Sequence, residues 1–296
     1  MGFKENGSNG FFFYDASNAA AIIFAIIFGA LLALHCWQSV KYKTTFMIVL
    51  IISVVLEFFG YITRSISITN TDALWANIAS QTTLIVAPAF LAAQDYMIIG
   101  RVMAYVGSQY GIINHNKITK IFVGADVLAI ITQAGGGAML AGAQGDIDQM
   151  KKAKNILLGG LVLQVITFAF FAFVAISFDL RSSRAPELKP YASEMRKMRK
   201  LWYAFYLSAV LVTVRSIYRT AEFGEVSFEP GKSTPDGYAL THEWLMYVLD
   251  SVPIFLSTAA FNLYHPGEFL PARKGSTIDG RQEAASNKSD VALQPV

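Results

Sequence analysis

The sequence predicts an all-α, polytopic membrane protein: a seven-transmembrane-helix bundle with its N-terminus outside the cell and its C-terminus in the cytoplasm. The composition gives the first evidence, because 54% of the 296 residues are hydrophobic and only 15% are charged, whereas about 25% are charged in soluble domains. The mean hydropathy of +0.42 agrees with this class. A transmembrane barrel would need alternating strands of about ten residues, and the sequence contains no such pattern.

Seven apolar segments are long enough to cross the hydrocarbon core of a bilayer, which requires about 20 residues of helix. They cover residues 18–38, 44–65, 73–106, 119–142, 155–178, 201–222 and 240–263. The third is overlong, so we expect it to tilt or to project from the bilayer. The chain then divides into an extracellular segment (1–17), the seven-helix domain (18–270) and a polar cytoplasmic tail (271–296) that we expect to be disordered.

The distribution of Lys and Arg gives the predicted orientation. Basic residues gather in the loops of one side, namely Lys41, Lys43, Arg101, Lys117, Lys120, the run 181–200, Arg273, Lys274, Arg281 and Lys288. The positive-inside rule makes this side cytoplasmic. The other side holds one exception, the group Lys151, Lys152 and Lys154. The basic loop 179–200 is expected to face anionic lipid headgroups rather than nucleic acid.

The first apolar segment contains few polar residues. His35 and Trp37 near its inner end are expected to lie at the membrane interface, where amphipathic rings are enriched, and we assign them no function. Cys36 is the single cysteine of the chain. An intramolecular disulfide is therefore impossible.

Polar residues recur at a spacing of seven in the other segments, which places them on one helix face two turns apart. They are Glu57 and Arg64 in the second segment, Gln81, Pro88 and Asp95 in the third, Asp126 and Gln133 in the fourth, and Glu243, Asp250 and Ser257 in the seventh. In the sixth, Arg215, Arg219 and Glu222 form a single stripe. Charges that face lipid would be uncompensated, so we expect these faces to converge on an internal polar cavity.

Each polar residue taken alone has a simpler interpretation. It would form a hydrogen bond between packed helices, or extend its charge to the headgroup region. The shared spacing favours the cavity. Gly135, Gly136 and Gly137 follow closely after Gln133. Three adjacent glycines permit either a close approach of helix backbones or a local break.

The direction of each helix separates two polar tiers. The outer tier is expected to hold Glu57, Arg64, Gln81, Arg215, Arg219, Glu222, Glu243 and Asp250, and the inner tier Asp95, Arg101 and Asp126. Two tiers indicate either a route across the membrane or a structural lattice of ion pairs, and both interpretations stay open. The free energy of inserting segment 201–222 into a bilayer is close to zero, since each central charge costs about 2.5–3.5 kcal/mol and offsets the gain from the apolar residues. Arg215 and Arg219 are therefore expected to be structural partners of acidic residues on the second and seventh helices.

Three signals for other functions fail. Gly231-Lys232-Ser233 resembles the end of a phosphate-binding loop, but Val226 stands where the first glycine is required. The four histidines lie on separate elements without paired spacing, which argues against a zinc site. The seventh segment contains no lysine to bind retinal. We therefore expect no cofactor, no metal and no catalytic residue.

Together, the motifs resemble one family, the fungal lipid-translocating exporters named for resistance to aminocholesterol. The residues that carry the resemblance are Glu57, Gly60, Tyr61, Arg64, Gln81, Ala87, Pro88, Tyr96, Gly100, Arg101, Phe122, Asp126, Gln133, the glycines 135–137, Gly160, Gln164, Arg215, Tyr218, Arg219, Glu222, Glu243, Tyr247, Asp250 and His265-Pro266-Gly267. Many relatives have a proline where this chain has Ala16, a departure in the entry segment. The resemblance implies a fungal plasma-membrane protein that exports or translocates sphingoid long-chain bases and supports tolerance of toxic amphiphiles. One branch of the family is linked instead to porphyrin and haem traffic.

The sequence and the resemblance together predict a transporter of amphiphilic, lipid-like molecules that is not an enzyme. Its expected partners are membrane lipids and an amphiphilic small molecule, not nucleic acid, and no protein partner is predicted. The residues expected to bind the substrate or to line the polar cavity are Glu57, Arg64, Gln81, Asp95, Asp126, Gln133, Arg215, Arg219, Glu222, Glu243 and Asp250. A receptor-like, lipid-binding sensor of membrane asymmetry stays as the alternative, because it shares the same topology.

Overall fold

The computed structural model describes residues 12, 14–70, 72–143, 146–227, 237–271 and 276–278. Within these ranges the fold is all-α and contains no β-strand. Most of the predicted segment 1–17, residues 228–236 and most of the predicted tail 271–296 lie outside the described residues. The described part thus comprises almost all of the predicted domain 18–270.

Among the described residues, seven helices are long and apolar enough to cross a membrane, which confirms the predicted fold class. Six are single helices: α1 (Asn18–Tyr42), α2 (Ile48–Thr69), α3 (Leu74–Val106), α4 (His115–Gly142), α5 (Ile147–Arg184) and α6 (Ala192–Glu225). The seventh joins α8 (Glu243–Met246), a π-helical turn η4 (Tyr247–Ser251) and α9 (Val252–Leu263). Shorter elements are α7 (Tyr238–Thr241), α10 (Pro266–Phe269) and the 3-10 turns η1 (Thr45–Met47), η2 (Ser108–Tyr110) and η3 (Pro186–Tyr191).

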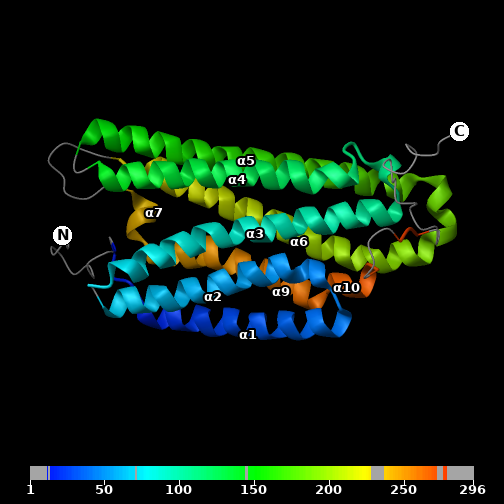
Figure 1. Cartoon of the computed structure of the whole chain (residues 1–296), viewed down its shortest axis with the longest axis horizontal. Coiled ribbons are helices and arrows are strands. Elements are labelled where there is room, and N and C mark those ends of the chain that lie inside the picture. The colour runs from blue at the N-terminus through cyan, green and yellow to red at the C-terminus, as the bar shows by residue number, and fades with distance from the viewer. Residues whose placement is uncertain are drawn as a thin grey trace, which may run out of the picture.

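The long helices run side by side along the long axis of the molecule (Figure 1). The α4–α5 hairpin forms one edge, α1 and α2 lie at the opposite edge, and α3, α6 and α9 lie between them. The most extensive packing joins α2 to α3, α4 to α5, and α1 to α2. The start of α1 and the end of α9 lie at opposite ends of the bundle, which we call the N-terminal and C-terminal ends.

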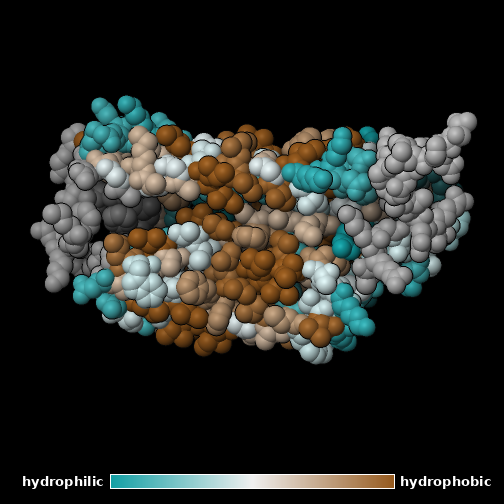
Figure 2. Space-filling view, in the orientation of Figure 1, coloured by the Kyte–Doolittle hydropathy of each residue, from teal (hydrophilic) through white to brown (hydrophobic). Residues whose placement is uncertain are grey.

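A hydrophobic band crosses the middle of the bundle on the face that Figure 2 shows. Figure 2 shows brown residues over this part and hydrophilic residues toward both ends. Large apolar side chains point outward from several helices, among them Ile26 of α1 (66% exposed), Ile131 of α4 (62%) and Ile166 of α5 (61%). Such a surface suits contact with lipid rather than with water. Which end faces the cytoplasm remains a prediction from the distribution of Lys and Arg.

Helices α5 and α6 continue well beyond their apolar segments. α5 has 38 residues, which span about 57 Å at 1.5 Å per residue, against a hydrocarbon core of about 30 Å. The Asp146 side chain caps its first turn by accepting two backbone hydrogen bonds, and Arg181 and Arg184 occupy its last turn. Both features complement the helix dipole. The predicted window 155–178 is thus the apolar part of a longer helix.

Two glycines allow α4 and α5 to approach closely. A Cβ atom on Gly136 would lie 2.6 Å from the backbone nitrogen of Leu157, and a Cβ atom on Gly160 would lie 2.8 Å from the carbonyl oxygen of Ala129. The glycines directly before and after Gly136 face open space. Because α4 is continuous through all three, the close approach is confirmed and the local break is not.

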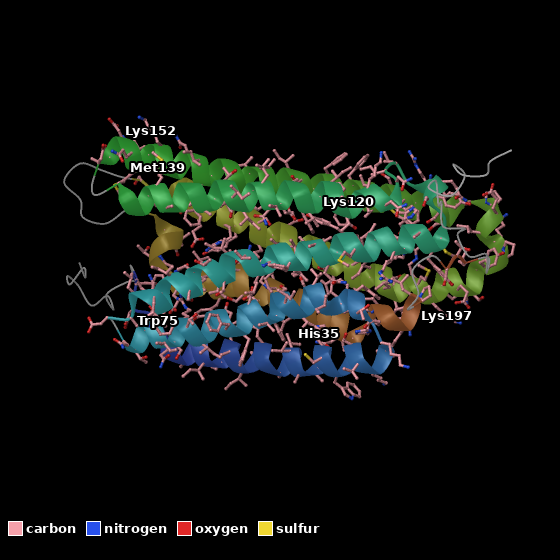
Figure 3. All side chains as sticks on the ribbon, viewed as in Figure 1. His35, Trp75, Lys120, Met139, Lys152 and Lys197 are labelled. Carbon is pink, nitrogen blue, oxygen red and sulfur yellow. The ribbon has the colours of Figure 1, made fainter. Side chains whose placement is uncertain are left out.

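The position of His35 corrects the sequence prediction. The sequence places this residue at the membrane interface, whereas its side chain is 1% exposed and its Nε2 lies 3.1 Å from the carbonyl oxygen of Thr258 in α9 (Figure 3). The reason is the packing of α1 on α9, which supplies the partner that a buried imidazole requires. Trp37 is 59% exposed and does lie on the surface.

Candidate polar site inside the bundle

Seven charged side chains gather toward the N-terminal end of the bundle, and we call them the arginine cluster. Its members are Glu57 and Arg64 of α2, Arg215, Arg219 and Glu222 of α6, Glu243 of α8 and Asp250 of η4. Each side chain is at most 12% exposed. They are seven of the eight residues that the sequence places in the outer tier. Burial of so many charges requires compensation within the protein.

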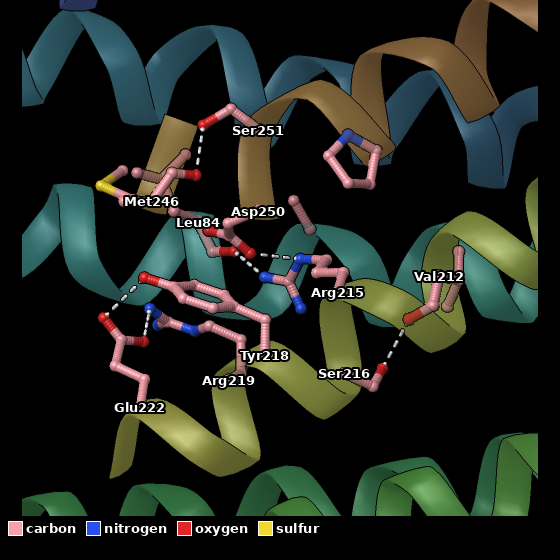
Figure 4. A network of polar contacts seen from close by, with 12 residues as sticks. Leu84, Val212, Arg215, Ser216, Tyr218, Arg219, Glu222, Met246, Asp250 and Ser251 are labelled. Carbon is pink, nitrogen blue, oxygen red and sulfur yellow. Dashed lines mark hydrogen bonds and ion pairs between the residues drawn. The ribbon is translucent and has the colours of Figure 1, made fainter. Parts of the chain in front are cut away.

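Arg215 connects α6 with two neighbouring helices. Its Nε lies 2.6 Å from Oδ1 of Asp250, and its Nη2 donates a hydrogen bond of 3.0 Å to the carbonyl oxygen of Leu84 in α3 (Figure 4). This carbonyl has no partner within α3, because Pro88 lies four residues later and has no N–H to donate. The proline therefore leaves an acceptor for a buried guanidinium.

Asp250 lies in the π-helical turn η4. There the backbone N–H of Val252 donates to the carbonyl oxygen of Tyr247, five residues earlier. Pro253 follows directly and cannot donate, so the regular ladder is interrupted at this point. The extra residue in the turn rotates the side chains before it relative to those after it. Ser257 accordingly bonds within its own helix, to the carbonyl oxygen of Pro253, and does not join the arginine cluster.

Arg219 is paired within its own helix. Its Nη1 lies 2.8 Å from Oε2 of Glu222, and the Tyr218 hydroxyl donates to Oε1 of Glu222 at 3.3 Å. The spacing of three residues lets Glu222 reach the guanidinium on the same helix face. The prediction that both arginines pair with acidic residues of the second and seventh helices is therefore confirmed for Arg215 and wrong for Arg219.

Arg64 is held by α8 and by the chain that precedes α1. Its Nη2 lies 2.9 Å from Oε1 of Glu243 and donates to the Tyr14 hydroxyl at 2.7 Å. Its guanidinium carbon lies 4.8 Å from the centre of the Phe12 ring, and the backbone N–H of Ser17 donates to Oε2 of Glu243 at 2.8 Å. Burial raises the pKa of the Tyr14 hydroxyl, although the charge of Arg64 opposes this. Residues before α1 therefore cover this part of the arginine cluster.

Glu57 is the one member of the arginine cluster that forms no ion pair with another described residue. It is 3% exposed, and the charges of Asp250, Arg215 and Arg219 act on it through space. The arginine cluster contains four carboxyl groups and three guanidinium groups. With all seven ionised, one negative charge is in excess, and a buried uncompensated charge is costly. One further cation or one proton would balance the arginine cluster.

Asp95 and Asp126 form a separate buried region. They are 0% and 3% exposed. The Ser208 hydroxyl donates to Asp95 at 2.9 Å, and the Tyr96 hydroxyl donates to Asp126 at 2.8 Å. Arg101, expected in the same tier, instead lies 4.0 Å from the centre of an aromatic ring of η1. Six residues separate it from Asp95, which places it on another face of α3.

The two predicted glutamines lie elsewhere. Gln133 is 7% exposed and donates to Oε1 of Gln164 at 3.2 Å, which joins α4 to α5. Gln81 is exposed on α3 and does not reach the arginine cluster. The expectation that all of these faces converge on one cavity is therefore wrong for these two residues. A seven-residue spacing drifts about 20° per repeat on a straight helix, and it does not specify which neighbour the face meets.

Two polar contacts escape prediction from the sequence. Asp179 is 5% exposed and accepts hydrogen bonds from Arg199 (2.7 Å) and Tyr206 (2.6 Å). The sequence places it at the start of a loop, because the apolar run ends just before it. Lys154 donates to the carbonyl oxygens of Gly224 and Val226 at 2.8 and 2.6 Å. This contact at the end of α6 gives a structural reason for one of the three lysines that break the charge rule.

Two cavities lie away from the arginine cluster. One of about 450 Å³ lies among the connections α3–α4 and α5–α6, with Tyr105, Glu187 and Ile278 in its wall. The other, of about 280 Å³, is lined by residues that include Asp179 and Arg199. No group of three or more His, Cys, Asp and Glu within the described ranges is placed to hold a metal ion.

The fold and the buried charges define a multi-pass membrane protein with a polar interior. Comparison with known sequences shows its family: residues 50–273 match the family described as "RTA1 like protein", and the chain belongs to it. This agrees with the resemblance found in the motifs. No solved structure matches the chain.

Three curated relatives illustrate the family. The "Probable lipid transporter atnI" of Emericella nidulans is 28% identical over 90% of this chain and 72% of its own length. The "Protoporphyrin uptake protein 1" of Saccharomyces cerevisiae is 33% identical over 71% of this chain and 65% of its own. The "Sphingoid long-chain base transporter RSB1" of the same species is 24% identical over 86% and 73%. All three similarities extend over most of this chain.

Proposed function

We propose that this protein is a transporter that moves amphiphilic, lipid-like molecules, sphingoid long-chain bases or related lipids, across or out of the plasma membrane. The observation that carries the proposal is the arginine cluster. In it, membrane-spanning helices hold four buried carboxyl groups close to three buried guanidinium groups. Charges inside a membrane are costly, and they mark substrate and ion pathways. The names of the relatives support cargo of this class.

A sphingoid long-chain base combines an ammonium headgroup with a hydrocarbon tail. In the arginine cluster, the ammonium group would balance the carboxylate in excess. Glu57 would contact it first, because the other carboxylates are already paired with arginines. The tail would stay in lipid, against the apolar surface of the bundle. Removal of such molecules would give tolerance of toxic amphiphiles, and we propose no enzymatic activity.

Transfer of a fluorescent long-chain base between leaflets of liposomes that contain the purified protein tests the proposal. Glu57→Gln removes the charge at nearly constant size. We expect the rate of transfer to fall about tenfold, which corresponds to about 1.4 kcal/mol added to the free-energy barrier of transfer. Glu194→Gln is the matched control, since Glu194 forms an exposed pair with Lys197, and it should leave transfer unchanged. Normal transfer by Glu57→Gln at equal protein level would remove Glu57 from the site.

A receptor-like sensor of membrane asymmetry is the second candidate. It is favoured by two ion pairs of the arginine cluster, Arg64–Glu243 and Arg215–Asp250, which link α2 and α6 to the seventh helix as a structural lattice would. The same liposomes separate the two functions. A sensor would bind the labelled base without accelerating its transfer between leaflets, and that result would reject the transporter.

A further inference from the structure

We propose that Asp95 and Asp126 are proton-binding groups, and that their protonation is coupled to movement of the cationic cargo. The inference rests on the proposed transport function and adds a second ion to it. Neither residue belongs to the arginine cluster, and neither has a role in the function proposed so far. Carboxyl groups buried in membrane helices are the usual components of proton pathways in pumps and transporters.

Among the residues that the structure describes, each carboxyl has a single hydrogen-bond donor. Oδ2 of Asp95 accepts from the Ser208 hydroxyl, and Oδ2 of Asp126 accepts from the Tyr96 hydroxyl. The two Oδ1 atoms are buried and have no hydrogen-bond partner among the described residues. An ionised carboxylate has about four acceptor sites, whereas a protonated acid carries its own donor. The surroundings of both residues therefore suit the neutral acid.

Within the described ranges, the packed helices bring no positive charge to either carboxyl. Within the described part of the chain, the titratable groups that act on one another here are Asp95, Tyr96 and Asp126 alone. From α6 the facing group is the hydroxyl of Ser208, and from α5 it is the ring of Phe171, whose centre lies 4.4 Å from that of Tyr96. From α2 no charged group acts on either carboxyl. This contrasts with the arginine cluster, where each paired carboxylate faces a guanidinium.

A carboxyl group that is neutral when buried releases its proton when water or a cation reaches it. Such access requires movement of α3, α4 and α6 relative to one another, because both residues are enclosed between these helices. Proton release is then tied to one conformation, and a proton gradient shifts the equilibrium between conformations. The ammonium cargo and the proton carry the same charge. Exchange of one for the other moves no net charge across the membrane.

Infrared difference spectra of the purified protein, recorded in liposomes between acidic and alkaline pH, test proton binding directly. Asp95→Asn and Asp126→Asn should each remove one component of the protonated carboxylic-acid band, and Asn keeps the size and neutrality that folding requires. Ser208→Ala and Tyr96→Phe should shift these components without removing them. The control Asp148→Asn, at an exposed position in the first turn of α5, should leave both of these components in place. A band that both Asn variants leave intact would overturn the proposal.

The coupling is measured with fluorescent long-chain base at equal concentration on both sides and an imposed pH gradient, relative to protein-free liposomes. The parent protein should build a gradient of the base, and reversal of the pH gradient should reverse it. In Asp95→Asn this response should be lost, while transfer down a base gradient persists. If the parent protein transfers the base but an imposed pH gradient builds no gradient of the base, the coupling is overturned and the proposed function stays intact. Absence of transfer under every gradient would reject both.

Discussion

Pro88 of α3 leaves the carbonyl oxygen of Leu84 free to accept a hydrogen bond from Arg215 of α6. Because the proline has no N–H, the carbonyl oxygen of Leu84 lacks its helical donor. It accepts a hydrogen bond from Nη2 of Arg215 instead. The Nε atom of the same guanidinium pairs with Asp250, which lies in a turn that a second proline, Pro253, follows. Two breaks in helical hydrogen bonding, in different helices, thus surround one buried cation.

Arg215 and Asp250 should therefore be strongly coupled in stability. Arg215→Ala leaves a buried carboxylate unpaired, and we expect a loss of about 3–5 kcal/mol. Adding Asp250→Asn should recover part of it, which denaturant or thermal unfolding in detergent measures as a double-mutant cycle. The cycle of Arg219 with Asp250 is the matched control and should show weaker coupling, because Arg219 pairs with Glu222. Equal coupling in both cycles would contradict the assignment.

Substitution of Gly136 should destabilise the α4–α5 hairpin. In Gly136→Ala the new Cβ atom would meet the backbone of Leu157 at 2.6 Å, and overpacking of this kind costs about 1–3 kcal/mol. Gly135→Ala is the control, since a Cβ atom there meets open space. It should be neutral or slightly stabilising, because Ala favours helix over Gly. Identical thermal unfolding of the two variants would show that the close approach is not tight.

Docking of the chain before α1 should weaken at alkaline pH. Burial raises the pKa of Tyr14 above the ordinary value of about 10. The docked form therefore keeps its phenolic proton where the undocked form loses it. The stabilisation is complete below about pH 10 and is lost as the pH rises through the raised value. Hydrogen exchange of the Ser17 amide, which donates to Glu243, reports the docking.

Tyr14→Phe keeps the ring and removes the titrating group. The exchange of the Ser17 amide should then lose the extra acceleration at alkaline pH, beyond the intrinsic rise. Tyr203→Phe changes an exposed tyrosine of α6 and should retain the behaviour of the parent. An unchanged pH profile in Tyr14→Phe would assign the effect to another group.

Lys154→Ala should loosen the end of α6. The lysine donates to the carbonyl oxygens of Gly224 and Val226, which lie where a helix no longer supplies partners. Loss of these bonds should cost about 0.5–1.5 kcal/mol and should accelerate hydrogen exchange in the last turn of α6. Lys152→Ala, at an exposed position on α5 (Figure 3), should do neither. Equal exchange in both variants would contradict the capping role.

The number and order of the membrane helices follow from the sequence, because apolar length alone decides which segments can cross a bilayer. Their ends do not. Asp179 lies in an apolar-to-charged transition, and the chain stays helical through it to Arg184. A hydropathy window stops where charge begins, whereas a helix stops only where its backbone hydrogen bonds end.

The sequence also predicts the charged stripe of α6 and predicts that these charges require partners of opposite charge. It does not predict which residues those partners are. Arg215 meets Asp250 because a π turn and a proline set the direction of that carboxylate, and periodicity assumes a regular helix. Gln81 has the same seven-residue spacing and yet is exposed. Spacing specifies a face of one helix, and only packing specifies what lies opposite.

Helices α5 and α6 extend beyond the bundle as a pair, joined by Ala185 and the six residues of η3. A compact folded domain spliced into η3 through two unbroken helical junctions would tumble with the bundle as a single rigid body. Particles of so small a chain carry little contrast once detergent surrounds them. Such a fusion would add a folded feature outside the micelle by which electron-microscopy images of the particle could be aligned. The native helices α5 and α6 would make its connection to the bundle rigid.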